Sequence, residues 1–247
     1  LLRSNGFGLL VEGFDYLPAL GIPYNPPYYV DQIESYGFAK ETDLLSGYLE
    51  PSIQLPDKLF QAADKVKQRD NFHVLKFKKK RELRKWIHEI DKIYHQAFLE
   101  NPNYFPSTHA EFEVMAENIY QVAIPQLVKI ILKGDQTAGF LLAYPNIGRA
   151  LQRTKGRLWP LGWIDILHEL RTTKHIDLNG VGLLPEFQGR GANMLMYAEL
   201  EHTLRDYQAQ YGETVQVDER NFKSRSDTEN AGGKWNKRHR LYRFNIE

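Results

Sequence analysis

The stretch Val181-Gly182-Leu183-Leu184-Pro185-Glu186-Phe187-Gln188-Gly189-Arg190-Gly191-Ala192-Asn193 carries the strongest structural signal in this chain. A strand predicted over residues 175–184 ends at a proline, passes through a glycine-rich turn and opens into a long helix predicted over residues 191–211. Glycines let a backbone approach a ligand closely, and the first helical turn presents unpaired N–H groups with partial positive charge. The stretch is therefore suited to a phosphate or pyrophosphate, although a turn without a ligand is the commoner use of such a pattern.

The apolar patterns on both sides of this turn alternate between strand and helix periods. They predict helices over residues 81–100 and 109–122, the second with a capping box at Thr108 and Glu111, and mostly helix over residues 147–172. Further strands are predicted over residues 72–77, 127–132, 138–144, 214–217 and 241–246. This order predicts an α/β (α+β) fold in which helices flank a mixed central sheet.

Composition excludes several classes of protein. The 247 residues carry 32 Lys+Arg against 31 Asp+Glu and no cysteine, which excludes a disulfide scaffold, thiolate metal sites and a cysteine nucleophile. No apolar run approaches the ~20 residues of a membrane span. We therefore expect a cytoplasmic protein with no membrane or nucleic-acid partner. The eight histidines form no H-E-x-x-H motif, and no metal site is expected.

The turn resembles a known signature. Gln188-x-x-Gly191, preceded by Pro185-Glu186-Phe187, is similar to the acyl-CoA motif of the GNAT N-acetyltransferase superfamily, which reads Gln/Arg-x-x-Gly-x-Gly/Ala. Asn193 departs from that motif at its last position. The resemblance covers residues 71–247 and implies the GNAT fold with acetyl-CoA, or another acyl-CoA, as cofactor. It places the pyrophosphate on Gln188, Gly189, Arg190, Gly191, Ala192 and Asn193.

The resemblance also implies a mechanism, in which an acetyl group passes from acetyl-CoA to a primary amine by direct attack. Val181 and Leu183 would offer backbone groups to pantetheine, with an amide such as that of Leu183 holding the thioester oxygen. Asp177 occupies the place of a catalytic carboxylate, and Asn221 that of an asparagine near the CoA thiol. Asp177 as a solvated strand residue and Asn221 as a turn former are the alternatives.

The general acid departs from the family pattern. Thr228 stands where many members carry a tyrosine, so solvent or another tyrosine such as Tyr242 would have to serve. With Asn193, this favours an alternative reading, a GNAT-fold binding or scaffolding module with a degenerate site. A third reading is an aminoacyl or long-chain acyl transferase whose hydrophobic pocket comes from residues 159–167, which could equally be ordinary packing. The acceptor, a small-molecule or peptide amine, is not specified by the sequence.

The first fifty residues suggest an internal repeat. Asn25 to Phe38 resembles the last strand–helix–strand of a GNAT unit, and a similar element recurs at Asn221 to Gly233. The interpretation is that residues 1–50 are the C-terminal part of a preceding GNAT-like unit, 51–70 a linker helix and 71–247 a complete GNAT domain. This resembles uncharacterised bacterial tandem-GNAT proteins, and the chain is expected to continue upstream of Leu1. Pairing with that preceding half, or a homodimer, is expected.

The charge is unevenly distributed near the C-terminus. Residues 220–243 carry eight Lys and Arg against two acidic residues, a local +6 in a chain of net charge +1. Such a stretch could attract an anionic cofactor or an acidic partner, or it could simply be solvated.

Overall fold

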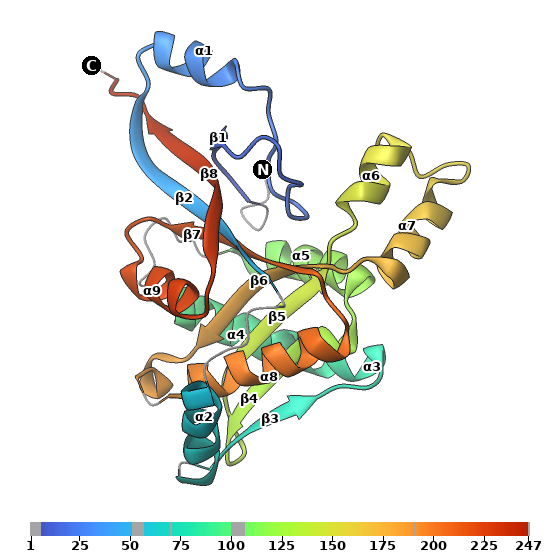
Figure 1. The fold of residues 1–247 in the computed structure, drawn as a ribbon, viewed down its shortest axis with the longest axis vertical. Coiled ribbons are helices and arrows are strands. Elements are labelled where there is room, and N and C mark those ends of the chain that lie inside the picture. The colour runs from blue at the N-terminus through green and yellow to red at the C-terminus, as the bar shows by residue number, and fades with distance from the viewer. Residues whose placement is uncertain (1–5, 51–56, 70, 100–106, 190, 247) are drawn as a thin grey trace.

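Eight strands form one mixed sheet in the order β1-β8-β2-β7-β6-β5-β4-β3 (Figure 1). The computed structural model describes residues 6–50, 57–69, 71–99, 107–189 and 191–246. The strands are β1 (Leu9–Glu12), β2 (Ala39–Leu49), β3 (Phe72–Lys76), β4 (Val128–Lys133), β5 (Gln136–Pro145), β6 (His175–Leu183), β7 (Tyr211–Asp218) and β8 (Lys234–Arg243). Among the strand pairs of the described residues, only β6–β7 is parallel. The predicted mixed α/β architecture is confirmed.

The helices follow most of the predicted boundaries. They are α1 (Tyr29–Ser35), α2 (Asp57–Arg69), α3 (Lys80–Leu83), α4 (Ile87–Phe98), α5 (His109–Val122), α6 (Gly148–Thr154), α7 (Gly162–Thr172), α8 (Ala192–Asp206) and α9 (Phe222–Asn230). The single helix predicted over residues 81–100 is divided between α3 and α4 by a short 3₁₀ turn. None of the helices in the described part of the chain is both long and apolar enough to cross a membrane.

The capping box predicted before α5 is confirmed. The Thr108 backbone N–H donates to the Glu111 carboxylate at 2.8 Å, and the Glu111 N–H donates to the Thr108 hydroxyl at 3.3 Å. The last strand, in contrast, begins at Lys234 and not at Leu241 as predicted. Its first residues are mainly polar and charged, so their strand conformation depends on pairing with β2, which a local pattern does not reveal.

The apolar core surrounds the β3–β6 part of the sheet. Five consecutive residues of β4, Val128 to Leu132, are buried, which requires cover on both faces. Figure 1 shows α8 on one face and α4 on the other. From α4, the rings of Tyr94 and Phe98 lie 6.2 and 6.4 Å from the ring of Phe140 on β5. These helices therefore fix the position of β6, the strand next to β5.

Residues 6–50 contribute two strands to the same sheet. β1 pairs with β8, and β2 lies between β7 and β8, antiparallel to both. Their assignment to a preceding GNAT-like unit stays a prediction; in this structure they extend the sheet beyond β7. The helix predicted in the 51–70 linker is present as α2, and residues 51–56 lie outside the described part of the chain.

Candidate functional site

The parallel strands β6 and β7 diverge. Residues His175–Leu178 of β6 pair with Tyr211–Thr214 of β7, and the pairing ends there. Beyond this point β6 continues against β5 as far as Leu183, while β7 continues against β2 as far as Asp218. The edge of β6 that faces β7 is therefore open along its second half.

The open edge presents main-chain groups to this gap. The Leu184 N–H donates to the Ala138 carbonyl on the β5 side at 2.9 Å. Because the main-chain groups of successive strand residues point to opposite sides, those of Leu183 and Val181 point toward the gap. The Leu183 carbonyl accepts a hydrogen bond there from Gln188 Nε2 at 3.1 Å. The N–H groups of Val181 and Leu183 therefore face the gap, and their pairing with an extended ligand stays a prediction.

The glycine-rich turn connects this edge to the N-terminus of α8. Gly189 and Gly191 have φ values of 70° and 83°, in the left-handed region that favours glycine. Gly191 is the N-cap residue and offers no side chain to the first-turn N–H groups, so that of Asn193, which lines the cleft, remains available to an anion. Arg190 lies outside the described residues.

Gly191 also has a packing role that sequence reasoning missed. A Cβ atom built at Gly191 would lie 2.7 Å from Val66 Cγ2 of α2, whereas one built at Gly189 would have no neighbour within 4 Å. Any side chain at Gly191 would force the Val66 side chain of α2 to shift, while Gly189 faces open space. Gly189 is therefore the position at which the chemistry of the turn can be changed with the least effect on packing.

The edge and the turn open into one cleft of about 820 Å³, lined mainly by apolar atoms. The cleft brings together seven of the residues predicted for the site: Val181, Leu183, Gln188, Gly189, Gly191, Asn193 and Asn221. Ala192 is fully buried beneath the turn. Asn221 caps α9, because its side chain accepts a hydrogen bond from the Ser224 N–H at 3.1 Å. Its predicted place near the ligand and its alternative role as a turn former are both compatible with this position.

Asp177 does not line the cleft. Its side chain is fully buried; the carboxylate accepts hydrogen bonds from the Leu20 N–H at 2.9 Å and from the Asn146 side chain at 3.0 and 3.1 Å. Burial raises the pKa of Asp177 to about 6, and these hydrogen bonds only partly oppose that shift. The alternative of a solvated strand residue is wrong, and the structure places the carboxylate beneath the 17–22 segment, apart from the open edge of β6.

Asp177 belongs to a buried polar network. One potential ligand atom from each of His175, Asp177 and Glu213 lies within 4.8 Å of the others, a spacing that a metal ion could use. Glu213, however, forms an ion pair with Lys237 at 2.5 Å, and Asp177 has the donors described above. Both carboxylates are thus already held by protein groups, and we describe these residues as a polar network, not as a metal centre.

Tyr242 lies far along β8 from the cleft. It pairs with Lys40 of β2, and its hydroxyl donates to the Glu34 carboxylate of α1 at 2.9 Å. It is not among the residues that line the cleft. The structure therefore does not bring Tyr242 to the place where a general acid would be needed. The direction of β8 carries Tyr242 away from the cleft.

A second tyrosine does lie in the cleft, and sequence reasoning missed it. Tyr197 of α8 and Asp227 of α9 both line the cleft, together with Asn193, and the Asp227 carboxylate adds to the rise in the pKa of Tyr197. Burial raises the pKa of both Tyr197 and Asp227. Thr228 also lines the cleft, but its hydroxyl donates to the Ser224 carbonyl at 2.9 Å. The helical spacing of Tyr197 by itself indicates only apolar packing, because Asp227 lies thirty residues further along the chain.

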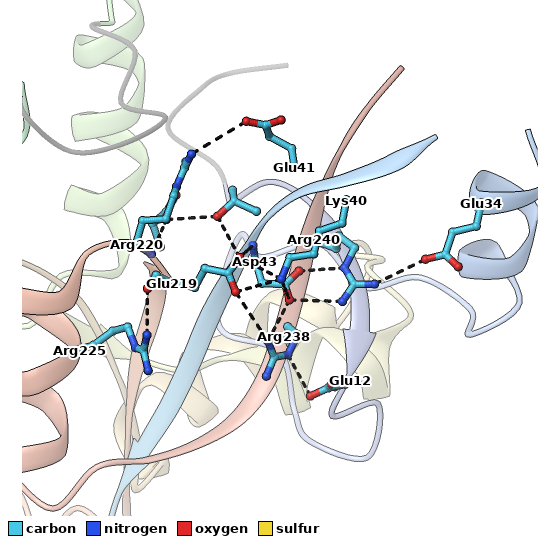
Figure 2. Close-up of polar contacts among 12 residues, drawn as sticks. Glu12, Glu34, Lys40, Glu41, Asp43, Glu219, Arg220, Arg225, Arg238 and Arg240 are labelled. Atoms are coloured by element: carbon cyan, nitrogen blue, oxygen red, sulfur yellow. Dashed lines mark hydrogen bonds and ion pairs between the residues drawn. The ribbon is translucent and has the colours of Figure 1, made fainter. Parts of the chain in front are cut away.

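The basic stretch at residues 220–243 is largely neutralised within the protein (Figure 2). Arg238 and Arg240 each lie 2.9 Å from the buried Asp43 carboxylate, and Arg220 lies 3.0 Å from Asp218. Acidic residues of β2 and β7 pair with these arginines, so little of the local charge predicted from the sequence is left for an anionic partner. Among its eight basic residues only Lys223 lines the cleft, where its Nζ donates to Gln188 Oε1 at 2.8 Å.

The N-terminal segment completes the cleft wall. Gly6, Phe7, Leu44 and Leu49 line it from the β2 side. Phe7 is fixed there because its N–H donates to Gln216 Oε1 at 3.1 Å and its carbonyl accepts from Gln216 Nε2 at 2.7 Å. No local pattern assigned these residues to the site, because their role depends on β2 lying next to β7.

A smaller apolar chamber of about 190 Å³ lies beside the cleft. The two cavities share Gly6, Tyr94, Met115 and Asn179 in their linings. The chamber is otherwise walled mainly by apolar side chains of α4 and α5, including Ile87, Ile90, Phe112, Ala116 and Ile119. An apolar group that enters the cleft next to β6 can therefore extend toward these helices.

Comparisons with known proteins were made for sequence and for structure. No family model matches the chain. It is 26% identical over 248 residues to Protein YghO of Escherichia coli (97% of this chain) and 27% identical over 242 residues to Bacterial ceramide synthase of Caulobacter vibrioides (95% of this chain). The chain spans 62% of the length of each of these relatives.

The solved structures that resemble it include GCN5-related N-acetyltransferases. A GCN5-related N-acetyltransferase from Sphaerobacter thermophilus has a TM-score of 0.54 at 14% identity, covering 93% of this chain and 59% of that one. A tandem GNAT protein from the clavulanic acid biosynthesis pathway has a TM-score of 0.53 at 10% identity, covering 89% and 59%. The chain therefore has the GNAT fold, as the turn motif predicted. At these identities the likeness concerns the fold, and function has to be argued from the site.

Proposed function

We propose that this protein is an acyl-CoA-dependent N-acyltransferase. The observation that carries the proposal is the continuity of one cleft, in which the open edge of β6 leads directly to the glycine turn and to the N-terminus of α8. An extended chain with a diphosphate at one end needs these two features in this order. The GNAT fold of the chain agrees with this reading.

The described residues fit coenzyme A. The pyrophosphate would be held by the first-turn N–H groups of α8, with open space above Gly189. Pantetheine would pair with the N–H groups of Val181 and Leu183 along the free edge of β6. Acyl-CoA supplies the acyl group as a thioester, activated for attack by an amine. The Leu183 N–H would hold the thioester oxygen, a contact typically worth ~10² to 10³ in rate.

Tyr197 and Asp227 are our candidates for proton transfer, because both line the cleft and each affects the pKa of the other. When the amine nitrogen bonds to the acyl carbon, the C–S bond breaks. Asp227 accepts the proton that the nitrogen releases, and Tyr197 donates its hydroxyl proton to the departing sulfur. The proton on Asp227 then returns to Tyr197, so the protein ends as it began. The raised pKa of Asp227 makes it a better base than an ordinary carboxylate.

The acyl chain and the amine are proposed to be lipid-like. The chamber walled by α4 and α5 offers apolar volume beyond that needed for an acetyl group. A ceramide is an amide between a fatty acyl group and a long-chain amino alcohol, and one relative is called a ceramide synthase. We therefore place a long-chain substrate ahead of the acetyl transfer expected from the turn motif alone. A scaffolding module with a degenerate site remains the second candidate, favoured by Thr228 and Asn193.

Binding is tested at Gly189. Asp and Asn both tolerate the left-handed backbone, and both would point into open space. Gly189→Asp puts a carboxylate against the diphosphate site, so we expect its Kd for CoA to rise at least tenfold more than that of the uncharged Gly189→Asn. The readout is thermal shift, since a ligand at 100 Kd stabilises the native state by about 2.7 kcal/mol. No shift of the unsubstituted protein with CoA or any acyl-CoA would favour the scaffolding module.

Catalysis is tested by comparing two aspartates. We expect Asp227→Asn and Tyr197→Phe to lower kcat by ~10² or more while CoA binding is retained. Asp177→Asn, which changes a group outside the cleft, should have a smaller effect. A larger loss for Asp177→Asn than for Asp227→Asn would restore Asp177 as the base and contradict our assignment.

Chain length is tested at Ala116, which lines the chamber but not the cleft. Ala116→Phe fills apolar volume, so kcat/KM for palmitoyl-CoA should fall while that for acetyl-CoA changes little. Acetyl-CoA serves as the internal control in the same variant. Equal effects on kcat/KM for the two donors, or activity with acetyl-CoA alone, would favour acetyl-CoA as the substrate over a long-chain acyl-CoA.

A further inference from the structure

The hairpin formed by α6 and α7 stands away from the sheet (Figure 1). It connects the end of β5 to the start of β6. Its base is fixed by Asn146, whose side chain accepts from the Gly148 N–H at 2.7 Å and donates to the Asp177 carboxylate. Its two helices are joined by Arg153, which donates to Asp165 at 2.8 and 2.9 Å and to Glu169 at 2.6 Å. These hydrogen bonds therefore hold the hairpin in a defined position although it projects from the sheet.

The far end of this hairpin is apolar and exposed. Six large apolar side chains within ten residues are at least 45% exposed: Leu158, Trp159, Leu161, Trp163, Ile164 and Leu167. Trp159 is 83% exposed. We call these six residues the apolar tip. None of them lines the cleft or the adjoining chamber, so the predicted acyl or acceptor pocket in this region is wrong, and so is the alternative of ordinary packing.

Such a surface needs an apolar partner, because contiguous exposed apolar patches in folded proteins mark interaction sites. The indole N–H of Trp163 donates to the Pro160 carbonyl at 3.0 Å, so its polar atom is satisfied inside the hairpin. The apolar faces of that ring remain exposed. Tryptophan and leucine at a projecting turn are typical of segments that enter the boundary between lipid headgroups and acyl chains.

The charge next to the apolar tip indicates which kind of apolar partner would bind there. Residues 148–172 contain five Arg and Lys against two acidic residues, and both acidic residues are paired with Arg153. Within the described chain, Arg149, Lys155 and Arg157 form no ion pair and are exposed. Lys155 and Arg157 lie directly before the apolar tip. Free cations beside exposed tryptophan complement an anionic headgroup layer over an acyl interior.

We propose that the α6–α7 hairpin docks this protein on the surface of a bilayer that contains anionic lipid. The apolar tip enters the headgroup region, and Lys155 and Arg157 contact lipid phosphates. A second copy of the chain could also cover an apolar face, but the unpaired cations favour lipid. The expectation of no membrane partner rested on the lack of a membrane-spanning run, which does not bear on surface docking.

The experiment is vesicle flotation without CoA or any substrate, so its result is independent of the proposed acyltransferase activity. The probes are vesicles of phosphatidylcholine alone and vesicles that also contain phosphatidylglycerol. We expect binding to the mixed vesicles, weaker binding to phosphatidylcholine alone, and a loss of binding at high salt. A chain that fails to float with mixed vesicles would overturn the proposal.

The tip is tested with Trp159→Glu/Leu161→Glu, which should lower vesicle affinity at least tenfold. The matched control is Tyr36→Glu/Leu99→Glu, since these residues are 78% and 61% exposed but lie elsewhere. The control should float like the unsubstituted protein, and both variants should keep its melting temperature because the positions are exposed. Equal flotation of the two double variants would contradict the proposal.

The cations are tested with Lys155→Gln/Arg157→Gln. Each basic residue near an anionic surface contributes roughly a fivefold gain in affinity, so we expect a loss of roughly tenfold or more on mixed vesicles and little change on phosphatidylcholine. Light scattering on the same samples tests whether a second copy of the chain covers the apolar tip instead of lipid. A dimer that Trp159→Glu/Leu161→Glu converts to a monomer, with no vesicle binding, would show that a second copy covers the tip and that the proposal is wrong.

Discussion

The two halves of the sheet are held together by different forces. The β3–β6 half is packed with apolar side chains on both faces, and its central residues Ile130, Ile131 and Phe140 are fully buried. The half made by β1, β8 and β2 has at its centre a buried carboxylate, Asp43, surrounded by cations (Figure 2). The candidate cleft lies where these halves meet, because β6 belongs to the first and β2 and β7 enclose it from the other side.

Asp43 shows that the half of the sheet made by β1, β8 and β2 depends on paired charges. Its burial by itself raises the pKa, but hydrogen bonds from Arg240, Lys40 and Arg238 outweigh burial and hold the pKa below its usual range. A buried charge that is paired in this way is tolerated, whereas one that loses its partner is costly. Apolar packing is insensitive to pH, and the charged half is not. This difference can be tested by substitutions and by pH.

Asp43→Asn should have the largest effect. The change leaves Arg238 and Arg240 half-buried without their shared anion, and we expect a loss of about 4 kcal/mol in the free energy of unfolding. Urea denaturation measures it without adding salt. A loss below ~1 kcal/mol would mean that the charged half is held mainly by its backbone pairing.

Ile130→Ala tests the apolar half. The residue is fully buried in the middle of β4, and the cavity left behind should cost about 3 kcal/mol. The effect should be the same at pH 5 and pH 7, because no titrating group is removed. A marked pH dependence of this loss would show that the two halves are coupled more closely than their contacts indicate.

The pH dependence of stability should contain opposite contributions from two buried aspartates. The pKa of Asp177 rises to about 6 on folding, so between about pH 4 and 6 the native state keeps a proton that the unfolded state releases, and stability falls as pH rises. The full contribution is about 3 kcal/mol. Asp43, with a lowered pKa, stabilises above about pH 4 and loses that contribution as pH falls.

Asp177→Asn separates these contributions. Its unfolding free energy, measured by urea denaturation from pH 4 to 7, should lack the decline seen in the unsubstituted protein between about pH 4 and 6. A decline that persists unchanged in the variant would assign it to another group.

Lys40→Met should have the smallest effect and serves as a control for Asp43→Asn. Lys40 lies 2.9 Å from the Asp43 carboxylate, but its side chain is 40% exposed, so water can replace much of the interaction. We expect a loss of ~0.5 kcal/mol, reduced further by salt. A loss as large as that of Asp43→Asn would show that Lys40, and not the arginine pair, compensates the buried charge.

The apolar half was predicted well, and the reason is local. Within residues 127–144, the apolar residues either alternate with polar ones or form continuous runs as long as a strand. Thr108 and Glu111 form the hydrogen bonds that cap the N-terminus of a helix, and they lie within four residues of each other. The turn at residues 188–193 could also be predicted from the sequence, because left-handed glycines and the start of a helix depend on adjacent residues. Under the proposed function, these residues supply the main-chain contacts to the cofactor.

The parts that were not predicted depend on partners distant in the chain. The basic run at 220–243 suggested a patch, but its counter-charges come from residues 41, 43 and 213, on other strands. Tyr197 gained a polar role only through Asp227, and Tyr242 lost its predicted one because β8 runs away from the cleft. Asp177 occupies the expected strand position but is covered by Leu20 and held by Asn146.

The sequence by itself determined the mixed α/β architecture, the glycine turn that starts α8 and the strand that leads into it. Each follows from neighbouring residues, through apolar period, capping and backbone freedom. Only the tertiary structure decided that β6 and β7 separate after Leu178, that β2 inserts next to β7, and which charges are neutralised. It also decided that the 158–167 segment projects outward. Strand order and ion pairing join residues far apart in the chain, and their energies depend on burial that no local pattern contains.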